Sequence, residues 1–186
     1  MFKKFYPYEH IDSVFSIDYD ALYKKGYRGI IFDLDNTLVH HGDNSNDKVD
    51  NLFKHIHSIG FKTLLLTNND QERVERFIKN INTQYICDAN KPDTLNYLKA
   101  VDLLNLKKSE VVYVGDQIFI DIVGANKCGI ASILVDFIRI DGETKIGKKR
   151  YIEKIILMFY KKSKYRGRIG NISKVNKDGK KVILWN

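Results

Sequence analysis

Two carboxylates stand two positions apart at the end of a short apolar run. Asp33 and Asp35 follow the β-branched and aromatic segment Ile30-Ile31-Phe32, and Asn36-Thr37 after them is typical of a turn. Two like charges held this close favour a metal ion, a shared proton or contact with solvent. Taken alone, the segment could also be a strand that ends in a turn and a helix cap. The rest of the chain decides between the two.

Further polar residues end or follow apolar segments later in the chain. They are Thr67 with Asn68, then Lys91, then Asp116 with Asp121. Because the carboxyl ends of parallel strands meet at one edge of a sheet, we expect these side chains beside Asp33 and Asp35. Carboxylates, a hydroxyl and a lysine are the groups that phosphoryl transfer with a magnesium ion requires. Asp33 and Asp116 are the predicted Mg²⁺ ligands, whereas Thr67 and Lys91 are predicted to hold the phosphate.

The hydrophobic pattern alternates between short buried strands and amphipathic helices. Strands are predicted at residues 29–34, 63–66, 85–87, 111–114 and 131–135. Helices are predicted at residues 47–59, 70–78, 92–104 and about 122–128, with Pro92 at a first helical position. This order predicts an α/β fold, a doubly wound Rossmann-like parallel sheet covered by helices on both faces.

Charge divides the chain unevenly. We expect a lead-in segment at residues 1–28, a catalytic core at 29–140, and a basic extension at 141–186 made of a helix and a short hairpin at 168–185. Residues 1–144 contain 17 Lys and Arg against 21 Asp and Glu, whereas residues 145–186 contain 14 against 2. The net charge of +8 therefore comes from the last quarter, which indicates an anionic partner.

Composition excludes several classes of protein. The 186 residues are 44% hydrophobic and 29% charged, and no run approaches the roughly eighteen apolar residues of a membrane-spanning helix. The N-terminus lacks the apolar core of a signal peptide, and Cys87 and Cys128 have no metal-binding spacing. We therefore expect a cytoplasmic protein with reduced thiols, with peripheral binding at the inner membrane face as an open alternative. His40 and His41, adjacent in a polar loop, are expected to be solvated.

Four short motifs occur in order along residues 28–136. The first is Asp33-Leu34-Asp35-Asn36-Thr37, and the second is the apolar strand that ends at Thr67. The third is Lys91-Pro92, and the fourth is Gly115-Asp116 with Asp121 five positions on. This set resembles the haloacid dehalogenase (HAD) superfamily of aspartate-nucleophile phosphatases. It is most similar to cap-less members of subclass IIIA, the small bacterial YqeG family and the related phosphatidylglycerophosphate phosphatases.

The resemblance implies roles for the acidic residues. Asp33 would attack phosphorus and form an aspartyl-phosphate. Asp35 would protonate the leaving oxygen and then activate the hydrolytic water. The Mg²⁺ ligands would be Asp33, the backbone carbonyl of Asp35, and Asp116.

The resemblance also implies how the phosphate is held. Thr67, Asn68 and Lys91 would bind the phosphoryl group, and Asp121 would orient Lys91 or a metal-bound water. A favourable charge at a helix start is the alternative explanation for Asp121. Only 23 residues lie between Thr67 and Lys91, and the loop after the first motif is short, so neither gap can hold a cap domain. We expect an open site.

The basic helix after residue 147 bears on the substrate. An apolar stripe runs along it, formed by Tyr151, Ile152, Ile155, Ile156 and Phe159. Lysines and arginines flank this stripe, which is typical of helices that bind an anionic membrane surface, here through residues 148–168. The alternative is that the stripe packs on the sheet and the lysines are merely solvated. Nothing in the sequence indicates an oligomeric state.

Three functions remain in view. The first is a Mg²⁺-dependent phosphomonoesterase that acts on a phosphorylated lipid headgroup resembling phosphatidylglycerophosphate. The second is a phosphatase of a soluble sugar phosphate or nucleotide. The third is a HAD-like binding module for RNA or ribosomal partners, which is disfavoured because no RNA-binding motif is present and because binding alone does not need Asp35.

Overall fold

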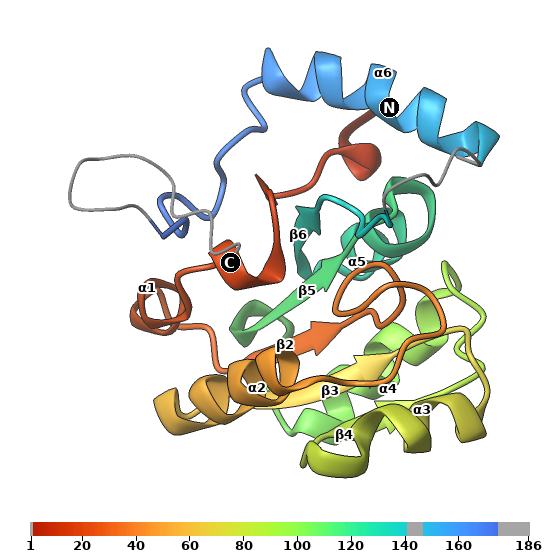
Figure 1. Cartoon of the computed structure of the whole chain (residues 1–186). Coiled ribbons are helices and arrows are strands. Elements are labelled where there is room, and N and C mark those ends of the chain that lie inside the picture. The colour runs from red at the N-terminus through yellow and green to blue at the C-terminus, as the bar shows by residue number, and fades with distance from the viewer. Residues whose placement is uncertain (1, 141–146, 175–186) are drawn as a thin grey trace.

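One sheet of six strands forms the centre of the computed structural model, which describes residues 2–140 and 147–174 (Figure 1). The strands are β1 (Glu9–Ile11), β2 (Gly29–Phe32), β3 (Lys62–Leu66), β4 (Gln84–Ile86), β5 (Val111–Gly115) and β6 (Ala131–Val135). Their order is β1-β6-β5-β2-β3-β4, and all neighbouring pairs are parallel. The predicted α/β class with a parallel sheet is confirmed.

The chain builds the two halves of this sheet in opposite directions. From β2 it moves outward to β3 and β4, and then it returns to the other side of β2 with β5 and β6. Open sheets of this kind bind ligands where the direction reverses, beyond the carboxyl ends of the strands. Here that place lies at the ends of β2 and β5.

Helices cover both faces of the sheet. They are α1 (Tyr19–Lys24), α2 (Asp47–Ile59), α3 (Gln71–Phe77), α4 (Thr94–Leu104), α5 (Val123–Cys128) and α6 (Lys148–Lys161). Alternate residues of β2 point to opposite faces: Ile30 and Phe32 lie in the cluster with α1, α2 and α3, whereas Ile31 lies in the cluster with α4 and α5. Burial on both faces explains why the strands are almost wholly apolar.

Side-chain caps fix where three of these helices begin. Asn46, Asp70 and Asp93 each accept a hydrogen bond from a backbone N–H of the first turn of α2, α3 and α4. The expectation that Pro92 occupies a first helical position is wrong. Because the Asp93 side chain caps α4, the helix begins after it, at Thr94.

The N-terminal segment adds an edge strand that the sequence did not indicate. Residues of β1 pair with β6, with Glu9 opposite Ile133 and Ile11 opposite Val135. The strand is three residues long and reads Glu-His-Ile, so its hydrophobic pattern carries no strand signal. The predicted lead-in segment is thus part of the sheet.

Residues 168–170 are held by this N-terminal segment. The Arg168 guanidinium stacks on Tyr8 at 3.6 Å from the ring centroid, and Glu9 accepts hydrogen bonds from the backbone N–H groups of Ile169 and Gly170. The predicted hairpin at 168–185 falls largely on residues 175–186, which lie outside the described residues. In the described ranges, no helix is long and apolar enough to cross a membrane.

Candidate active site

Asp33 and Lys91 are in direct contact at the carboxyl ends of β2 and β5. Asp33 follows β2 and is buried. The Lys91 Nζ lies 2.5 Å from Asp33 Oδ1 and 2.8 Å from Asp121 Oδ1, and it lies 3.0 Å from the Tyr113 hydroxyl. The Lys91 side chain is only 3% exposed, so these carboxylates balance its charge almost without water. The structure brings three predicted site residues into one buried network.

Three of the acidic residues form a cluster that could hold a metal ion. One carboxylate oxygen each from Asp33, Asp116 and Asp121 lies within 4.8 Å of the other two. The Thr37 Oγ1 lies between them, 3.0 Å from Asp33 Oδ2 and 3.3 Å from Asp116 Oδ1. Oxygen donors without nitrogen or sulfur suit a hard cation such as Mg²⁺. The donor set therefore fits the predicted ion.

Burial and mutual repulsion change the acidity of this cluster. Burial, followed by the charges of Asp121 and Asp33, raises the pKa of Asp116 to about 8 against the opposing effect of Arg150. Burial raises the pKa of Asp33 to about 6, although Lys91 opposes the shift. Burial alone would lower the pKa of Lys91, but the charges of Asp121 and Asp33 raise it above its ordinary value. Lys91 is therefore a fixed positive charge beside the two acids.

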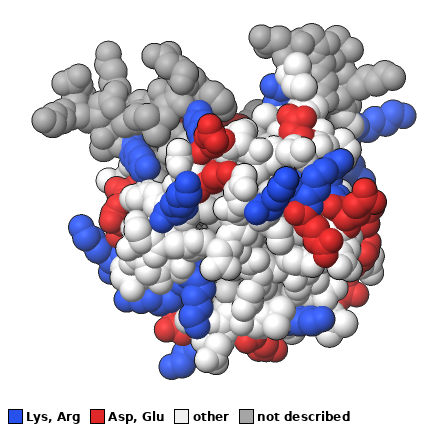
Figure 2. Space-filling view, turned by 60° about the horizontal axis from the view of Figure 1, so that its bottom comes forward, with Lys and Arg blue, Asp and Glu red and all other residues white. Residues whose placement is uncertain are grey.

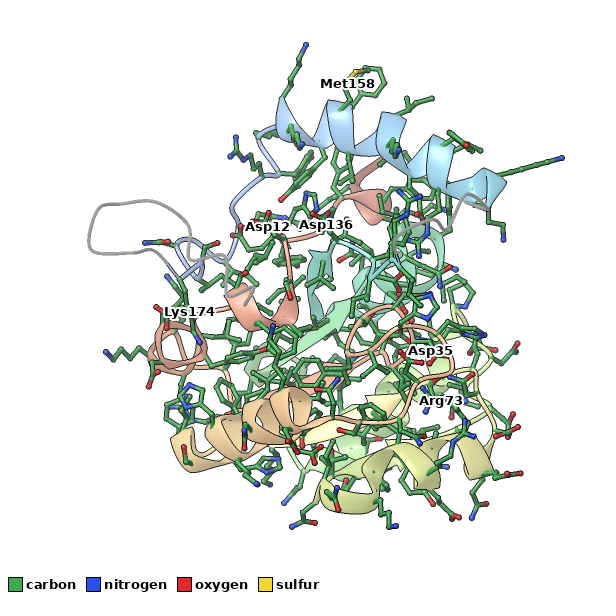
Figure 3. The ribbon with its side chains drawn as sticks, viewed as in Figure 1. Asp12, Asp35, Arg73, Asp136, Met158 and Lys174 are labelled. Atoms are coloured by element: carbon green, nitrogen blue, oxygen red, sulfur yellow. The ribbon has the colours of Figure 1, made fainter. Side chains whose placement is uncertain are left out.

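Asp35 lies outside that cluster and faces a different set of partners. Its Oδ1 accepts a hydrogen bond from Arg73 Nη2 at 2.8 Å, and its Oδ2 accepts one from Asn69 Nδ2 at 3.1 Å (Figure 3). The His41 Nδ1 lies 2.8 Å from the same Oδ2. Burial would raise the pKa of Asp35, but the hydrogen bond and charge of Arg73 outweigh it and lower that pKa. Asp35 is thus ionised at neutral pH in this arrangement.

A surface hollow of about 300 Å³ opens beside Asp35. Its lining includes His41, Asn69, Arg73 and Arg76 as well as Asp35. The hollow is therefore next to the residue that the sequence predicts as the acid/base. His41, expected to be merely solvated, is 71% exposed but touches Asp35, because the loop after β2 folds back over the first motif.

The strand-end residues Thr67 and Asn68 have different surroundings. Thr67 is buried, and its Oγ1 accepts a hydrogen bond from the Asn69 side chain at 2.8 Å. The Asn68 side chain holds the Lys91 backbone instead: its Oδ1 accepts from the Lys91 N–H at 2.7 Å, and its Nδ2 donates to the Lys91 carbonyl at 3.4 Å. Asn68 therefore holds the Lys91 backbone in place, and direct binding of phosphate by Asn68 stays a prediction.

Arg150 reaches the site from α6. Its guanidinium contacts the Asp116 carboxylate and, at 2.5 Å, the Asp116 backbone carbonyl. Glu153, one turn along α6, accepts hydrogen bonds from Arg150 and from the Phe119 N–H. A helix far away in sequence thus contacts a predicted metal ligand.

Four residues of this site were not predicted from the sequence, namely Thr37, Arg73, Tyr113 and Arg150. Thr37 stands within the first motif and could have been included. Arg73 lies one turn into the helix that follows the second motif, so its position on α3 was a usable signal. Tyr113 and Arg150 had none, because the first is an ordinary strand residue and the second belongs to a distant helix.

Comparisons with known proteins agree with this geometry. The family model described as haloacid dehalogenase-like hydrolase matches residues 42–129. A relative from Bacillus subtilis, "Probable phosphatase YqeG", is 35% identical over 137 residues, which cover 73% of this chain and 80% of that protein. The chain belongs to the haloacid dehalogenase-like hydrolases. The predicted enzyme class, a phosphatase of this family, is confirmed.

Solved structures show the same HAD fold at low identity. An uncharacterized protein from Listeria monocytogenes serotype 4b is 20% identical, with a TM-score of 0.51 over 73% of this chain and 99% of that one. The cobalt-bound deoxy-D-mannose-octulosonate 8-phosphate phosphatase from Haemophilus influenzae is 16% identical, with a TM-score of 0.50 over 77% and 93%. At such identity these likenesses establish the fold alone.

Proposed function

We propose that this HAD phosphatase hydrolyses phosphate monoesters through an aspartyl-phosphate on Asp33, with Mg²⁺ as cofactor. The contact between the Asp33 carboxylate and the buried Lys91 ammonium carries the proposal. A nucleophile at a strand end, a fixed positive charge beside it and two further carboxylates within 4.8 Å are arranged as phosphoryl transfer requires. A binding module would have no use for such a costly buried set.

Each half of the reaction uses the residues in turn. A carboxylate oxygen of Asp33 forms a bond to phosphorus while the bond from phosphorus to the leaving oxygen breaks, and that oxygen takes a proton from Asp35. A water then gives its proton to Asp35 and attacks phosphorus, which releases phosphate and restores the Asp33 carboxylate. The lowered pKa of Asp35 suits the second half. The negative substrate must raise that pKa for the first half.

Lys91 and Thr67 would hold the phosphoryl oxygens during both halves. The Lys91 ammonium is positioned by Asp121 and by Tyr113 and cannot move far without breaking those contacts. A bound Mg²⁺, held by Asp33, Asp116 and the backbone carbonyl of Asp35, would offset the negative charge of the phosphoryl oxygens. That one structural neighbour was solved with cobalt bound supports a divalent ion in this fold.

The substrate we favour is a phosphorylated lipid headgroup, of the phosphatidylglycerophosphate type. Within the described residues, the loop after β2 and the segment from Thr67 to Lys91 carry no cap domain over Asp33 and Asp35. A substrate held at a surface does not need such a cap, because its own membrane restricts it. Arg73 and Arg76 beside the hollow would suit the second, diester phosphate of such a headgroup.

A soluble sugar phosphate or nucleotide is the second candidate. The hollow beside Asp35 is open to solvent and could also admit such molecules. The cobalt-bound phosphatase from Haemophilus influenzae, whose fold is similar, is named for a sugar phosphate substrate. RNA or ribosomal partners remain a third, weaker candidate, supported only by the basic C-terminal segment.

The test is a phosphate-release screen over lipid, sugar and nucleotide phosphates with Mg²⁺ present and absent. We expect release that needs the ion, is fastest with the lipid phosphate, and falls by about three orders of magnitude in Asp33→Asn. Equal release by Asp33→Asn would overturn the nucleophile. Phosphate release from soluble substrates only would rule out the lipid substrate, but it would still agree with hydrolysis through an aspartyl-phosphate on Asp33.

A further inference from the structure

The helix α6 turns a row of large apolar side chains to solvent. This outer face consists of Tyr151, Ile152, Ile155, Met158 and Phe159, each 52–57% exposed. Their spacing of three, four and seven residues places them along one side of the helix. Met158, in the last turns of α6, extends from the helix on the side away from the sheet (Figure 3). An apolar row of this size on a charged helix calls for a partner.

The opposite side of α6 is what attaches the helix to the protein. Glu153 and Tyr160 are buried, and Ile156 and Leu157 pack on the cluster around Ile118. The predicted stripe is therefore split, because Ile156 turns inward and Met158 takes its place outside. Packing of the whole stripe on the sheet, the alternative left open by the sequence, is wrong for the outer face.

The exposed charges that α6 itself carries beside the outer face are all positive, although Asp12 and Asp136 line a hollow together with Lys154, Met158 and Lys161. Lysines stand at both ends of α6 and along its edges, at positions 148, 149, 154, 161 and 162. The only acid of α6, Glu153, is buried and bonded to Arg150 and the Phe119 N–H. On the face of the molecule shown in Figure 2, by contrast, basic and acidic side chains are interspersed. The outer face thus joins apolar side chains to a positive rim.

We propose that the outer face of α6 docks on an anionic lipid surface. The apolar row would lie at the boundary between headgroups and acyl chains, with the lysines on the headgroup phosphates. A second copy of this chain fits less well, because two such faces would bring their lysines together. Nucleic acid fits less well too, because its phosphate backbone offers nothing to a row of isoleucine, methionine and phenylalanine.

The same helix connects this surface to the active site. Arg150 of α6 contacts Asp116, and a cavity of about 110 Å³ lies between α6 and the end of β6, lined by both residues and by Phe137 and Leu157. Docking would therefore hold the acidic cluster close to the lipid surface. The inference that the docked enzyme finds its substrate at this surface rests on the proposed function. The inference that α6 docks on the surface does not depend on it.

Vesicle co-sedimentation of the full chain tests the proposal. The vesicles are phosphatidylcholine alone or phosphatidylcholine mixed with phosphatidylglycerol. The variant is Ile155→Asn with Phe159→Asn, and the control is Leu95→Asn, because Leu95 on α4 is 70% exposed but lies outside the outer face. We expect binding only to the anionic vesicles, weakened about tenfold or more in the double variant and unchanged in the control.

Four outcomes would overturn docking. They are equal binding to neutral vesicles, no binding to either kind, binding unaffected by the double variant, and a wild-type dimer that the double variant dissociates. Hydrolysis of a soluble aryl phosphate, measured on the same samples, separates the two claims. If the double variant still hydrolyses the aryl phosphate but no longer sediments with the anionic vesicles, docking is supported. If neither the wild type nor the variants hydrolyse the aryl phosphate, the proposed function fails, and the co-sedimentation result alone decides whether docking occurs.

Discussion

Arg73 forms the contact that decides when Asp35, the proposed acid/base residue, holds a proton. The 2.8 Å ion pair lowers the pKa of Asp35, so the ionised form dominates in the free enzyme. Replacing Arg73 by Gln removes the opposing charge while burial stays, and burial raises the pKa. Hydrolysis of the aspartyl-phosphate is the half of the reaction that needs Asp35 as a base. The low-pH limb of its rate, followed in single turnovers, should then move upward by about one unit.

The control for this shift is Arg76→Gln. Arg76 lines the same hollow, one turn further from the start of α3, and the ion pair at Asp35 is made by Arg73. Its replacement removes the same charge and should leave the position of the limb unchanged. An Arg73→Gln enzyme with the wild-type profile would mean that Asp35 does not control the limb.

Asp116 and Asp33 link metal binding to protons. Their pKa values of about 8 and about 6 mean that Asp116 keeps its proton at pH 7 and that Asp33 is only partly ionised at pH 6. A divalent ion needs the ionised forms, so the apparent Mg²⁺ affinity should rise about tenfold from pH 6 to pH 7 and level off above pH 8. Calorimetric titration in two buffers should record proton release at pH 7. A pH-independent affinity with no proton release would contradict the raised pKa values.

The predictable and unpredictable residues of the site differ in one physical respect. Asp33, Lys91 and Asp121 lie in the segments that follow β2, β4 and β5, and strand order in a parallel sheet is enough to bring them together. Arg73 touches Asp35 only because the loop after β2 folds back toward α3. Side-chain contacts between a loop and a helix depend on that local path, which hydrophobic periodicity does not encode.

At the scale of elements, α6 acts on the metal site through one side chain. The Arg150 guanidinium occupies the Asp116 carboxylate that a divalent ion would use, and its charge repels a cation. Loss of Arg150 also raises the pKa of Asp116 further, so the comparison belongs at a pH high enough to ionise Asp116 in both proteins. There Arg150→Met should bind Mg²⁺ more tightly, by about tenfold. Lys149→Met, which removes a neighbouring exposed charge, should change the affinity much less. Unchanged or weaker binding in Arg150→Met would show that Arg150 does not compete with the ion.

Helix α5 packs closely on α4, with Gly124 directly against the ring of Tyr97. A Cβ at Gly124 would overlap the ring of buried Tyr97, whose hydroxyl donates to the Ile120 carbonyl next to Asp121. Gly124→Ala should lower the free energy of unfolding by about 1–3 kcal/mol in urea denaturation. Gly147→Ala is the matched control, since a Cβ there meets nothing within 4 Å. Equal stability of the two variants would show that the Tyr97 ring moves freely.

Elements were predictable where their pattern was strong. Strands β2, β3, β5 and β6 consist mostly of apolar residues, and α2 has the predicted bounds because Asn46 and Gly60 cap its ends. The short polar strand β1 had no such signal. The stripe on α6 was visible, but its orientation was not, because either side of that helix is apolar enough to face the protein.

For the whole molecule, the sheet and the charge distribution have separate tasks. The switch point of the sheet gathers the proposed catalytic groups, while the lysines of α6 stand beside an apolar helix face that the fold leaves exposed. The four motifs predicted the first arrangement because parallel strands end together. The second needed the structure, because charge and apolarity along a helix do not say which side is buried.

The central claim is that Asp33 carries the phosphoryl group during turnover. The most direct measurement is mass spectrometry of the acid-quenched enzyme, digested after brief mixing with an aryl phosphate and Mg²⁺. We expect a phosphoryl group on the peptide that contains Asp33, present in the wild type and missing in Asp33→Asn. A phosphoryl group on any other peptide, or wild-type turnover by Asp33→Asn, would contradict it.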